Sequence, residues 1–507
     1  MVRISRAALT VVLLTSSLGV IPATAAASCA ADGHPGGAWP AMNADLANTR
    51  HQADEVSIGP DEADQLTPAW TFSNEANLIA GPYQSTPIVA GGCVYAATSS
   101  GFVVALNADT GALVWAHVFP GAKLLAIGSG YGNVYVFPYG DAKGPRAAAL
   151  DMSTGEVVWE TERLVAPISE DGQKSEGQQP NLAPVVFDGM LFFSGSYAFG
   201  NVRVPLYFLD AHTGETIKRF SLISEEERAA GYGCCATWAT PAVDDDANVL
   251  YLATADSESF RKQHPYNQSF VKIAADRSDL EALGTVLGSY RGTEERYIDD
   301  QLPPGVSFDD LPTCENGSEG KGPLPGTSTS SSTDCLEVDV DFGASPTLFT
   351  GPSGRQIIAD VQKSGVLHAA YTADMSRAFA HALSAPGAVG NAATSAWDGT
   401  HLYATFNGGT MWSFDDEGGI AWAGHNLADA TRYQPTSVAN GVVYTITAGG
   451  FLLARDAATG VPVLHRQIAA DAGATSCSAQ GSGVAIARNT IYAPCESGAI
   501  VAYRVAA

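Results

Sequence analysis

The sequence predicts an all-β fold, an eight-bladed β-propeller of four-stranded antiparallel blades that an N-terminal strand closes. Three observations predict it: short alternating apolar runs along the chain, a recurring tight turn before a strand ending in tryptophan, and repeated proline-containing openings. Short runs in which apolar residues alternate with others, separated by Gly, Ser and Asn, are typical of antiparallel strands. Self-similarity along the chain indicates a repeat architecture rather than a string of separate domains.

One complete repeat shows the four strands in order, at 85–89, 93–97, 101–106 and 107–115. Its closing part contains the turn Asp109-Thr110-Gly111 and ends in tryptophan. That closing pattern recurs at 149–159, 208–214, 414–422 and 455–460. We count eight units, which begin near residues 85, 124, 181, 238, 343, 391, 433 and 481.

The ends of the repeats predict how the ring closes. The last unit stops at 499–503 without a fourth strand, and a strand at 69–72 can supply it. Closure of this kind protects the edges of the sheets. We expect Trp115, Trp159 and Trp422, at the ends of their units, to pack between neighbouring blades.

The first 25 residues have the features of a secretory signal peptide. Arg3 and Arg6 precede an apolar run at 7–21, and Ala23-Thr24-Ala25 offers a cleavage site. The run is too short for a membrane span, and no later segment is long and apolar enough for one. The sequence therefore predicts a secreted or cell-envelope protein without a membrane span. An alternative, a lipid anchor at Cys29, lacks the usual leucine three residues earlier.

Three parts follow from this organisation: the signal peptide at 1–25, an N-terminal segment at 26–67, and the propeller at 68–507. A long insertion at 289–340 lies between blades four and five and contains a Pro-Pro pair and the run "TSTSSST". Insertions of this composition are typical of surface loops. The formal net charge of -26 argues against nucleic acid and anionic membranes as partners.

Eight cysteines follow the predicted cleavage site, and an even number in an exported chain favours disulfides. The sequence has no CxxC or CxxCH motif, which argues against structural zinc and against a fused c-type haem. Cys314–Cys335 and Cys477–Cys495 are the local pairs, and they leave Cys29–Cys93 and the adjacent Cys234–Cys235.

The N-terminal segment and the repeats carry a family resemblance. Trp39-Pro40, the stretch "DLANTR" at 45–50 and the strand at 68–72 resemble the opening of the quinoprotein alcohol dehydrogenases, and of their polyvinyl-alcohol dehydrogenase branch in particular. These are eight-bladed propellers that bind pyrroloquinoline quinone (PQQ). The resemblance covers nearly the whole mature chain. It implies an alcohol substrate, PQQ as cofactor, and a separate cytochrome c or another electron acceptor.

Two segments resemble the reactive part of the family's site. Asp341, in "DVDFGASP", matches the family's catalytic base. A carboxylate suits that role, because it can accept the alcohol proton as hydride moves to the quinone. Lys363, in "QKSG", matches a basic residue that faces the anionic quinone. The alternatives are a turn aspartate and a solvated loop lysine. Gly343 stands where lanthanide-using relatives carry an aspartate, so the resemblance implies calcium.

Further positions resemble cofactor and metal contacts. Trp238 matches the floor on which the planar cofactor stacks. Asp256 matches a calcium ligand, and Asn181 a polar cofactor contact, although both also suit turns. We expect a Cys234–Cys235 ring to line the mouth beside Trp238.

One departure leaves two functions open. The family's glutamate ligand follows a "SGxE" strand, which here reads Ser194-Gly195-Ser196-Tyr197 without a carboxylate. The enzyme hypothesis is supported by Asp341, Lys363, Asp256 and Trp238 on adjacent blades. The alternative is a non-catalytic propeller that binds protein or polymer at the mouth of the ring.

Overall fold

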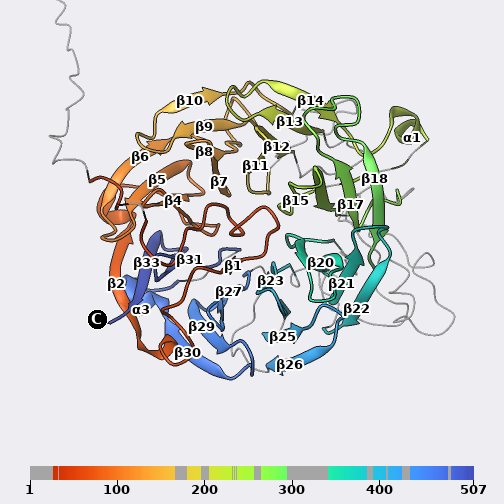
Figure 1. Cartoon of the computed structure of the whole chain (residues 1–507). Helices are drawn as coiled ribbons and strands as arrows, with labels where there is room; N and C mark the ends of the chain where they lie inside the picture. The colour runs from red at the N-terminus through yellow and green to blue at the C-terminus, as the bar shows by residue number, and fades with distance from the viewer. Residues whose placement is uncertain are drawn as a thin grey trace, which may run out of the picture.

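Eight four-stranded sheets form a closed ring in the computed structural model, as the sequence predicts (Figure 1). Each inner strand begins shortly after the start predicted for its unit, and the fourth strand of each blade lies at the outer rim. The structure describes residues 27–31, 33–165, 180–195, 205–230, 232, 234–235, 237–255, 264–293, 341–384, 392–406, 409–424, 434–477 and 481–506.

The first four blades follow the chain order. Blade one comprises β3 (Ile88–Ala90), β4 (Cys93–Ala97), β5 (Phe102–Asn107) and β6 (Leu113–Val118). Blade two comprises β7 (Ile127–Gly130), β8 (Asn133–Val136), β9 (Ala148–Asp151) and β10 (Val157–Glu160). Blade three comprises β11 (Val185–Phe187), β12 (Met190–Ser194), β13 (Leu206–Asp210) and β14 (Thr216–Phe220). Blade four comprises β15 (Ala242–Asp244), β16 (Val249–Ala253), β17 (Ser269–Ala274) and β18 (Val286–Arg291).

The remaining blades complete the ring. Blade five comprises β19 (Thr347–Thr350), β20 (Gln356–Val361), β21 (Val366–Tyr371) and β22 (Arg377–Ala382). Blade six comprises β23 (Ala396–Trp397), β24 (Leu402–Phe406), β25 (Thr410–Phe414) and β26 (Ile420–Gly424). Blade seven comprises β27 (Ser437–Ala439), β28 (Val442–Ile446), β29 (Phe451–Asp456) and β30 (Pro462–Gln467). Blade eight comprises β31 (Ala485–Ala487), β32 (Thr490–Cys495), β33 (Ala499–Val505) and the N-terminal β2 (Leu66–Ser73).

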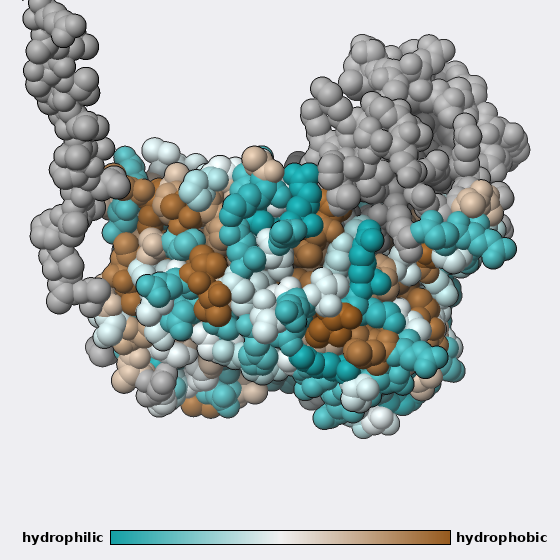
Figure 2. Space-filling model, turned by 90° about the horizontal axis from the view of Figure 1, so that it is seen from above, coloured by the Kyte–Doolittle hydropathy of each residue, from teal (hydrophilic) through white to brown (hydrophobic). Residues whose placement is uncertain are grey.

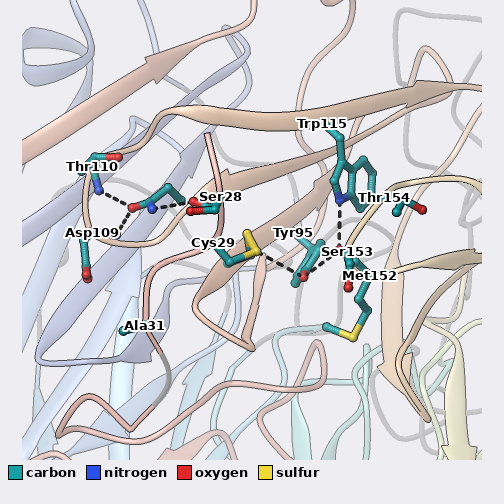
Figure 3. The surroundings of a disulfide bond; sticks show 12 residues. Ser28, Cys29, Ala31, Tyr95, Asp109, Thr110, Trp115, Met152, Ser153 and Thr154 are labelled. Atoms are coloured by element: carbon teal, nitrogen blue, oxygen red, sulfur yellow. Dashed lines mark hydrogen bonds between the residues drawn. A yellow bond between two sulfur atoms is a disulfide. The ribbon is translucent and has the colours of Figure 1, made fainter. Parts of the chain in front are cut away.

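Three closing tryptophans each contact the blade that follows them, as expected, and Figure 3 shows the contact of Trp115. The indole N–H of Trp115 donates to the carbonyl of Met152 at 2.9 Å, in the turn of the following blade. A Cβ on Gly155 would lie 2.5 Å from that indole, so the tight turn must carry glycine here. Trp159 and Trp422 make the same bond to the turns that follow them.

Ring closure repeats this contact with a residue from the N-terminus. β2 pairs antiparallel with β33, which confirms that an N-terminal strand supplies the missing fourth strand. The indole of Trp70, on β2, donates to the carbonyl of Ala108 in blade one at 3.1 Å. Blade eight thus contacts blade one through the same kind of bond that Trp115, Trp159 and Trp422 make to the blades that follow them.

Three disulfides lie within the described residues. Cys29–Cys93 fastens the N-terminal segment to blade one (Figure 3), and Cys477–Cys495 lies within the last two blades. Cys234–Cys235 forms the predicted bond between neighbours. The predicted Cys314–Cys335 pair and the signal peptide lie outside the described residues, as does most of the predicted insertion, whose first residues belong to β18.

The N-terminal segment crosses the middle of the ring before it reaches β2 (Figure 1). Its short strand β1 (His51–Gln52) adds to blade seven in parallel with β27, an addition that the repeats did not predict. Backbone carbonyls of this segment accept N–H groups from successive inner strands. Leu46, Ala47, Thr49 and Arg50 accept from Val243, Leu348, Trp397 and Val438, respectively.

Arg50 anchors this central segment. Its guanidinium is fully buried and donates to the carbonyls of Met42, Thr436 and Val484 and to the hydroxyl of Ser437. Burial lowers the pKa of Arg50 to about 9, so the group stays cationic at neutral pH. One buried cation therefore ties the segment to blades seven and eight.

Helices contribute little to the described residues: α1 (Glu225–Ala229), α3 (Ile468–Ala472), and the single-turn helices η1 (Ala63–Gln65) and η2 (Glu75–Asn77). None of the helices described in the structure is long and apolar enough to cross a membrane. The side of the ring in Figure 2 is a mosaic of hydrophilic and hydrophobic residues. Apolar side chains such as Val158 and Leu287 are exposed on the outer strands.

Candidate functional site

The antiparallel blade order places two predicted site residues together. Asp341 precedes the inner strand β19, and Lys363 lies in the turn between β20 and β21. In an antiparallel blade the start of the first strand and the end of the second lie at the same end of the sheet. The backbone N–H of Lys363 donates to the carbonyl of Asp341 at 2.9 Å, and Phe342 bridges Gln362.

The side chains of these residues meet Trp238, which precedes the inner strand of blade four. The Lys363 ammonium lies 3.2 Å from Oδ2 of Asp341 and 4.6 Å from the centre of the Trp238 ring. Lys363 and Asp341 expose only 6% and 12% of their side chains, whereas Trp238 is half-buried. A Cβ on Gly343 would lie 2.6 Å from the indole, so glycine allows the ring to approach. The structure thus brings together carboxylate, ammonium and aromatic plane.

Asn48, in the central segment, joins the two blades that carry these residues. Its amide donates to the carbonyls of Thr240 and Pro346, both at 3.0 Å. Thr240 follows Trp238 in the chain, and Pro346 follows Asp341. The "DLANTR" stretch therefore fixes the relative position of the two opening segments, a role that the sequence did not reveal.

Hydroxyl groups link the openings of further blades in the same way. Thr240 Oγ1 accepts from the backbone N–H of Ala183 at 2.9 Å, and Ser345 Oγ accepts from that of Thr240 at 3.2 Å. Thr394 Oγ1 accepts from the N–H of Ser345 at 3.1 Å. The opening that contains Asn181 is thereby connected, through Thr240, to the segment that contains Trp238.

A buried polar network lies behind Lys363. Oε1 of Gln362 accepts from the backbone N–H of Thr293 at 2.9 Å and from the Ser364 hydroxyl at 2.7 Å, and lies 3.0 Å from Nε2 of His368. Nδ1 of His368 lies 3.0 Å from the Tyr290 hydroxyl. Burial lowers the pKa of His368 to about 3, so its ring is neutral in ordinary buffers.

The remaining predicted site residues are Cys234, Cys235, Asn181 and Asp256, of which the structure describes the first three. Cys234 and Cys235 are buried, pack against Ile223, and come shortly before Trp238 in the chain. Asn181 precedes the inner strand of blade three. Asp256 lies outside the described residues, so the structure gives it no position.

The described residues do not fit a calcium ion. Their one compact group of metal-ligand types is Cys234, Cys235 and His264, and its two sulfur atoms are bonded to each other. Calcium takes oxygen ligands. Ser194 ends the strand that resembles the one before the family's glutamate ligand. Its hydroxyl pairs with the Thr237 hydroxyl at 2.6 Å, and it offers no carboxylate. A planar polyanion, by contrast, fits the ammonium and indole of Lys363 and Trp238.

Two family models match parts of the chain. One, described as the β-propeller domain of glucose, ethanol and alcohol dehydrogenases, matches residues 39–125. The other, described as outer membrane protein assembly factor BamB, matches residues 331–507.

Curated relatives and a solved structure agree with the first of these matches. Polyvinylalcohol dehydrogenases of Pseudomonas sp. and Sphingopyxis sp. (strain 113P3) are 25% and 24% identical over 65% of this chain, which spans 48% of their length. The crystal structure of the quinohemoprotein alcohol dehydrogenase from Comamonas testosteroni aligns with a TM-score of 0.64 at 17% identity and covers 92% of this chain and 80% of its own. This chain is thus an eight-bladed propeller similar in sequence to the quinoprotein alcohol dehydrogenases, with polyvinylalcohol dehydrogenases among its relatives.

Proposed function

We propose that this chain is an exported PQQ-dependent dehydrogenase that oxidises an alcohol and passes the electrons to a separate acceptor. The observation that carries the proposal is the cluster of Asp341, Lys363 and Trp238 at one end of adjacent blades. Its three chemical functions are those that a planar, anionic quinone and an alcohol require together.

Each side chain has a definite task in this proposal. When bound, PQQ supplies the acceptor for the hydride equivalent that leaves the alcohol carbon. Asp341 accepts the hydroxyl proton at a carboxylate oxygen, which helps the carbon–hydrogen bond to break. Lys363 holds a positive charge where negative charge develops on the quinone oxygens. Trp238 supports the plane of the ring system and excludes water from one face.

The relatives suggest the substrate and the electron acceptor. Their names support an alcohol, and the polyvinylalcohol dehydrogenases support a polymeric secondary alcohol. A methanol dehydrogenase of Methylorubrum extorquens, 29% identical over 33% of this chain, carries cytochrome c in its name. We therefore propose a cytochrome c or another separate protein as the acceptor, and a secreted or cell-envelope location.

Reconstitution tests this function. The purified chain is mixed with PQQ, with and without Ca²⁺, and its absorption spectrum and dye reduction are recorded with primary, secondary and polymeric alcohols. Failure to bind PQQ at micromolar concentration would rule out the enzyme. Because the described residues offer no calcium site, the two metal conditions decide whether residues such as Asp256 supply one.

A variant pair assigns the base. Asp341→Asn keeps the shape of the side chain but cannot accept the proton, so turnover should vanish while PQQ still binds. Asp415→Asn, in the turn before β26, is the control and should turn over like the wild type. Unchanged turnover in Asp341→Asn would remove the residue from this role.

A non-catalytic propeller is the second candidate. It is favoured by the BamB family model over residues 331–507 and by the missing glutamate after Ser194-Gly195. A chain that binds no PQQ but retains a protein or polymer partner at its mouth would support this function instead.

A further inference from the structure

We infer that Gln362 is a positioning residue that holds the Lys363 ammonium over Trp238 and against Asp341. The network behind the turn, defined as Gln362, Ser364, Thr293, His368 and Tyr290, locks the turn from both sides of the lysine. Its effect on PQQ binding rests on the proposed function, whereas its effect on the lysine does not.

The turn that carries Lys363 is held first by backbone hydrogen bonds. Gln362 N–H donates to the Val366 carbonyl and Gly365 N–H to the Gln362 carbonyl, both at 2.9 Å. Gly365 has φ of +82°, a conformation that glycine adopts without strain. These bonds close the hairpin, but they do not set the direction of the lysine side chain.

The two residues beside Lys363 both point into the buried network. Gln362 is fully buried, and Ser364 is only 2% exposed. The amide of Gln362 pairs with both backbone groups of Thr293, since Oε1 accepts from the N–H at 2.9 Å and Nε2 donates to the carbonyl at 3.1 Å. Thr293 follows the outer strand of blade four, so this pairing ties the lysine turn to the blade that carries Trp238.

His368 contacts several members of the network through both ring nitrogens. Its Nδ1 lies 3.0 Å from the Tyr290 hydroxyl. Its Nε2 lies 3.0 Å from Oε1 of Gln362 and accepts from the backbone N–H of Thr293 at 3.2 Å. A buried amide held by several partners is costly to move, because each lost bond leaves a buried polar group unpaired.

Gln362→Met tests the inference in the protein without cofactor. The chain is labelled with 5-fluorotryptophan, and the ¹⁹F resonance of Trp238 is identified by its absence in Trp238→Phe. Lys363→Met should shift this resonance, because the ammonium lies 4.6 Å from the ring. Gln362→Met should shift it in the same direction, and the double variant should move no further than Lys363→Met alone.

PQQ binding gives the second readout. Gln362→Met should raise the dissociation constant about tenfold, with little further effect in a Lys363→Met background. Ser364→Ala, which removes the hydroxyl contacts to Gln362 and Thr293, should produce a smaller change of the same sign if Gln362→Met folds poorly. Thr490→Val, which removes the two hydrogen bonds of a buried hydroxyl in blade eight, controls for general destabilisation.

The outcomes separate the inference from the proposed function. A Trp238 resonance that stays in place in Gln362→Met, with melting lowered as in Thr490→Val, would show a purely structural role and overturn the inference. Additive shifts in the double variant would overturn it too. If the wild type binds no PQQ, the proposed function fails, and the resonance alone decides whether Gln362 positions Lys363.

Discussion

The Lys363 ammonium lies 4.6 Å above the ring centre of Trp238, although 125 residues separate the two in the chain (363 − 238). The contact joins blade five to blade four at the end of the ring where Asp341 also lies. A cation in this place attracts the electron-rich face of the indole and any anionic ligand that stacks on it.

Lys363→Met should lower PQQ-dependent turnover by about 100-fold, in the range found when one donor to a developing oxyanion is lost. The dissociation constant for PQQ should also rise, since the cofactor's carboxylates lose a cation. Dye reduction and fluorescence titration measure the two effects. Lys363→Arg keeps the charge and should retain more activity. Equal losses in both variants would contradict a role based on charge.

Gly343→Ala should weaken PQQ binding through Trp238. The new methyl group would lie 2.6 Å from the indole, so the ring must shift. Overpacking of this kind costs about 1–3 kcal/mol of stability. Binding is measured by titration and stability by urea unfolding. In a Trp238→Phe background the substitution should have a smaller effect on binding, and an equal effect in both backgrounds would contradict the mechanism.

Asp360→Asn should stabilise the protein increasingly as the pH rises. Burial raises the pKa of Asp360 well above 3.8, so the folded chain keeps a proton that the unfolded chain releases. The contribution of Asp360 to wild-type stability therefore falls by about 1.4 kcal/mol per pH unit as pH rises above 3.8, until the folded pKa is passed. Urea unfolding from pH 3 to pH 7 measures the difference. A constant difference over this range would contradict the prediction.

Arg50→Met should destabilise the ring by roughly 3–5 kcal/mol, because carbonyls in three parts of the chain lose a charged donor. The midpoint of guanidinium unfolding measures the change. Arg163→Met, at an exposed arginine, is the matched control and should have a much smaller effect. Similar midpoints for the two variants would show that the central segment contributes little to stability.

The fold could be predicted because its signals are local and repeated. The closing turn and the proline-containing opening each recur in several blades, so the eight starts and the role of Trp115 follow from the sequence. The strand β1 could not be predicted, because its two residues pair with blade seven through backbone groups that any sequence supplies.

The site could be predicted only where a motif names it. The structure brings Asp341, Lys363 and Trp238 together, while their roles stay predictions. Gln362 and His368 were missed because their bonds cross between blades four and five. Gln362 and His368 are six residues apart in the chain, which is a weak indication of contact. This spacing places the two side chains on one face of a hairpin only if the turn is known to span 362–365.

The pairing of Leu66 with Val505 has a consequence for how the chain folds. Blade eight is complete only after β33 has been synthesised. Until then β2 has an unpaired edge while the other seven blades form. Contacts this far apart in sequence slow folding, and waiting edges favour association between chains. The slowest and most aggregation-prone stage of folding should therefore be the open ring, and refolding yield should depend steeply on protein concentration.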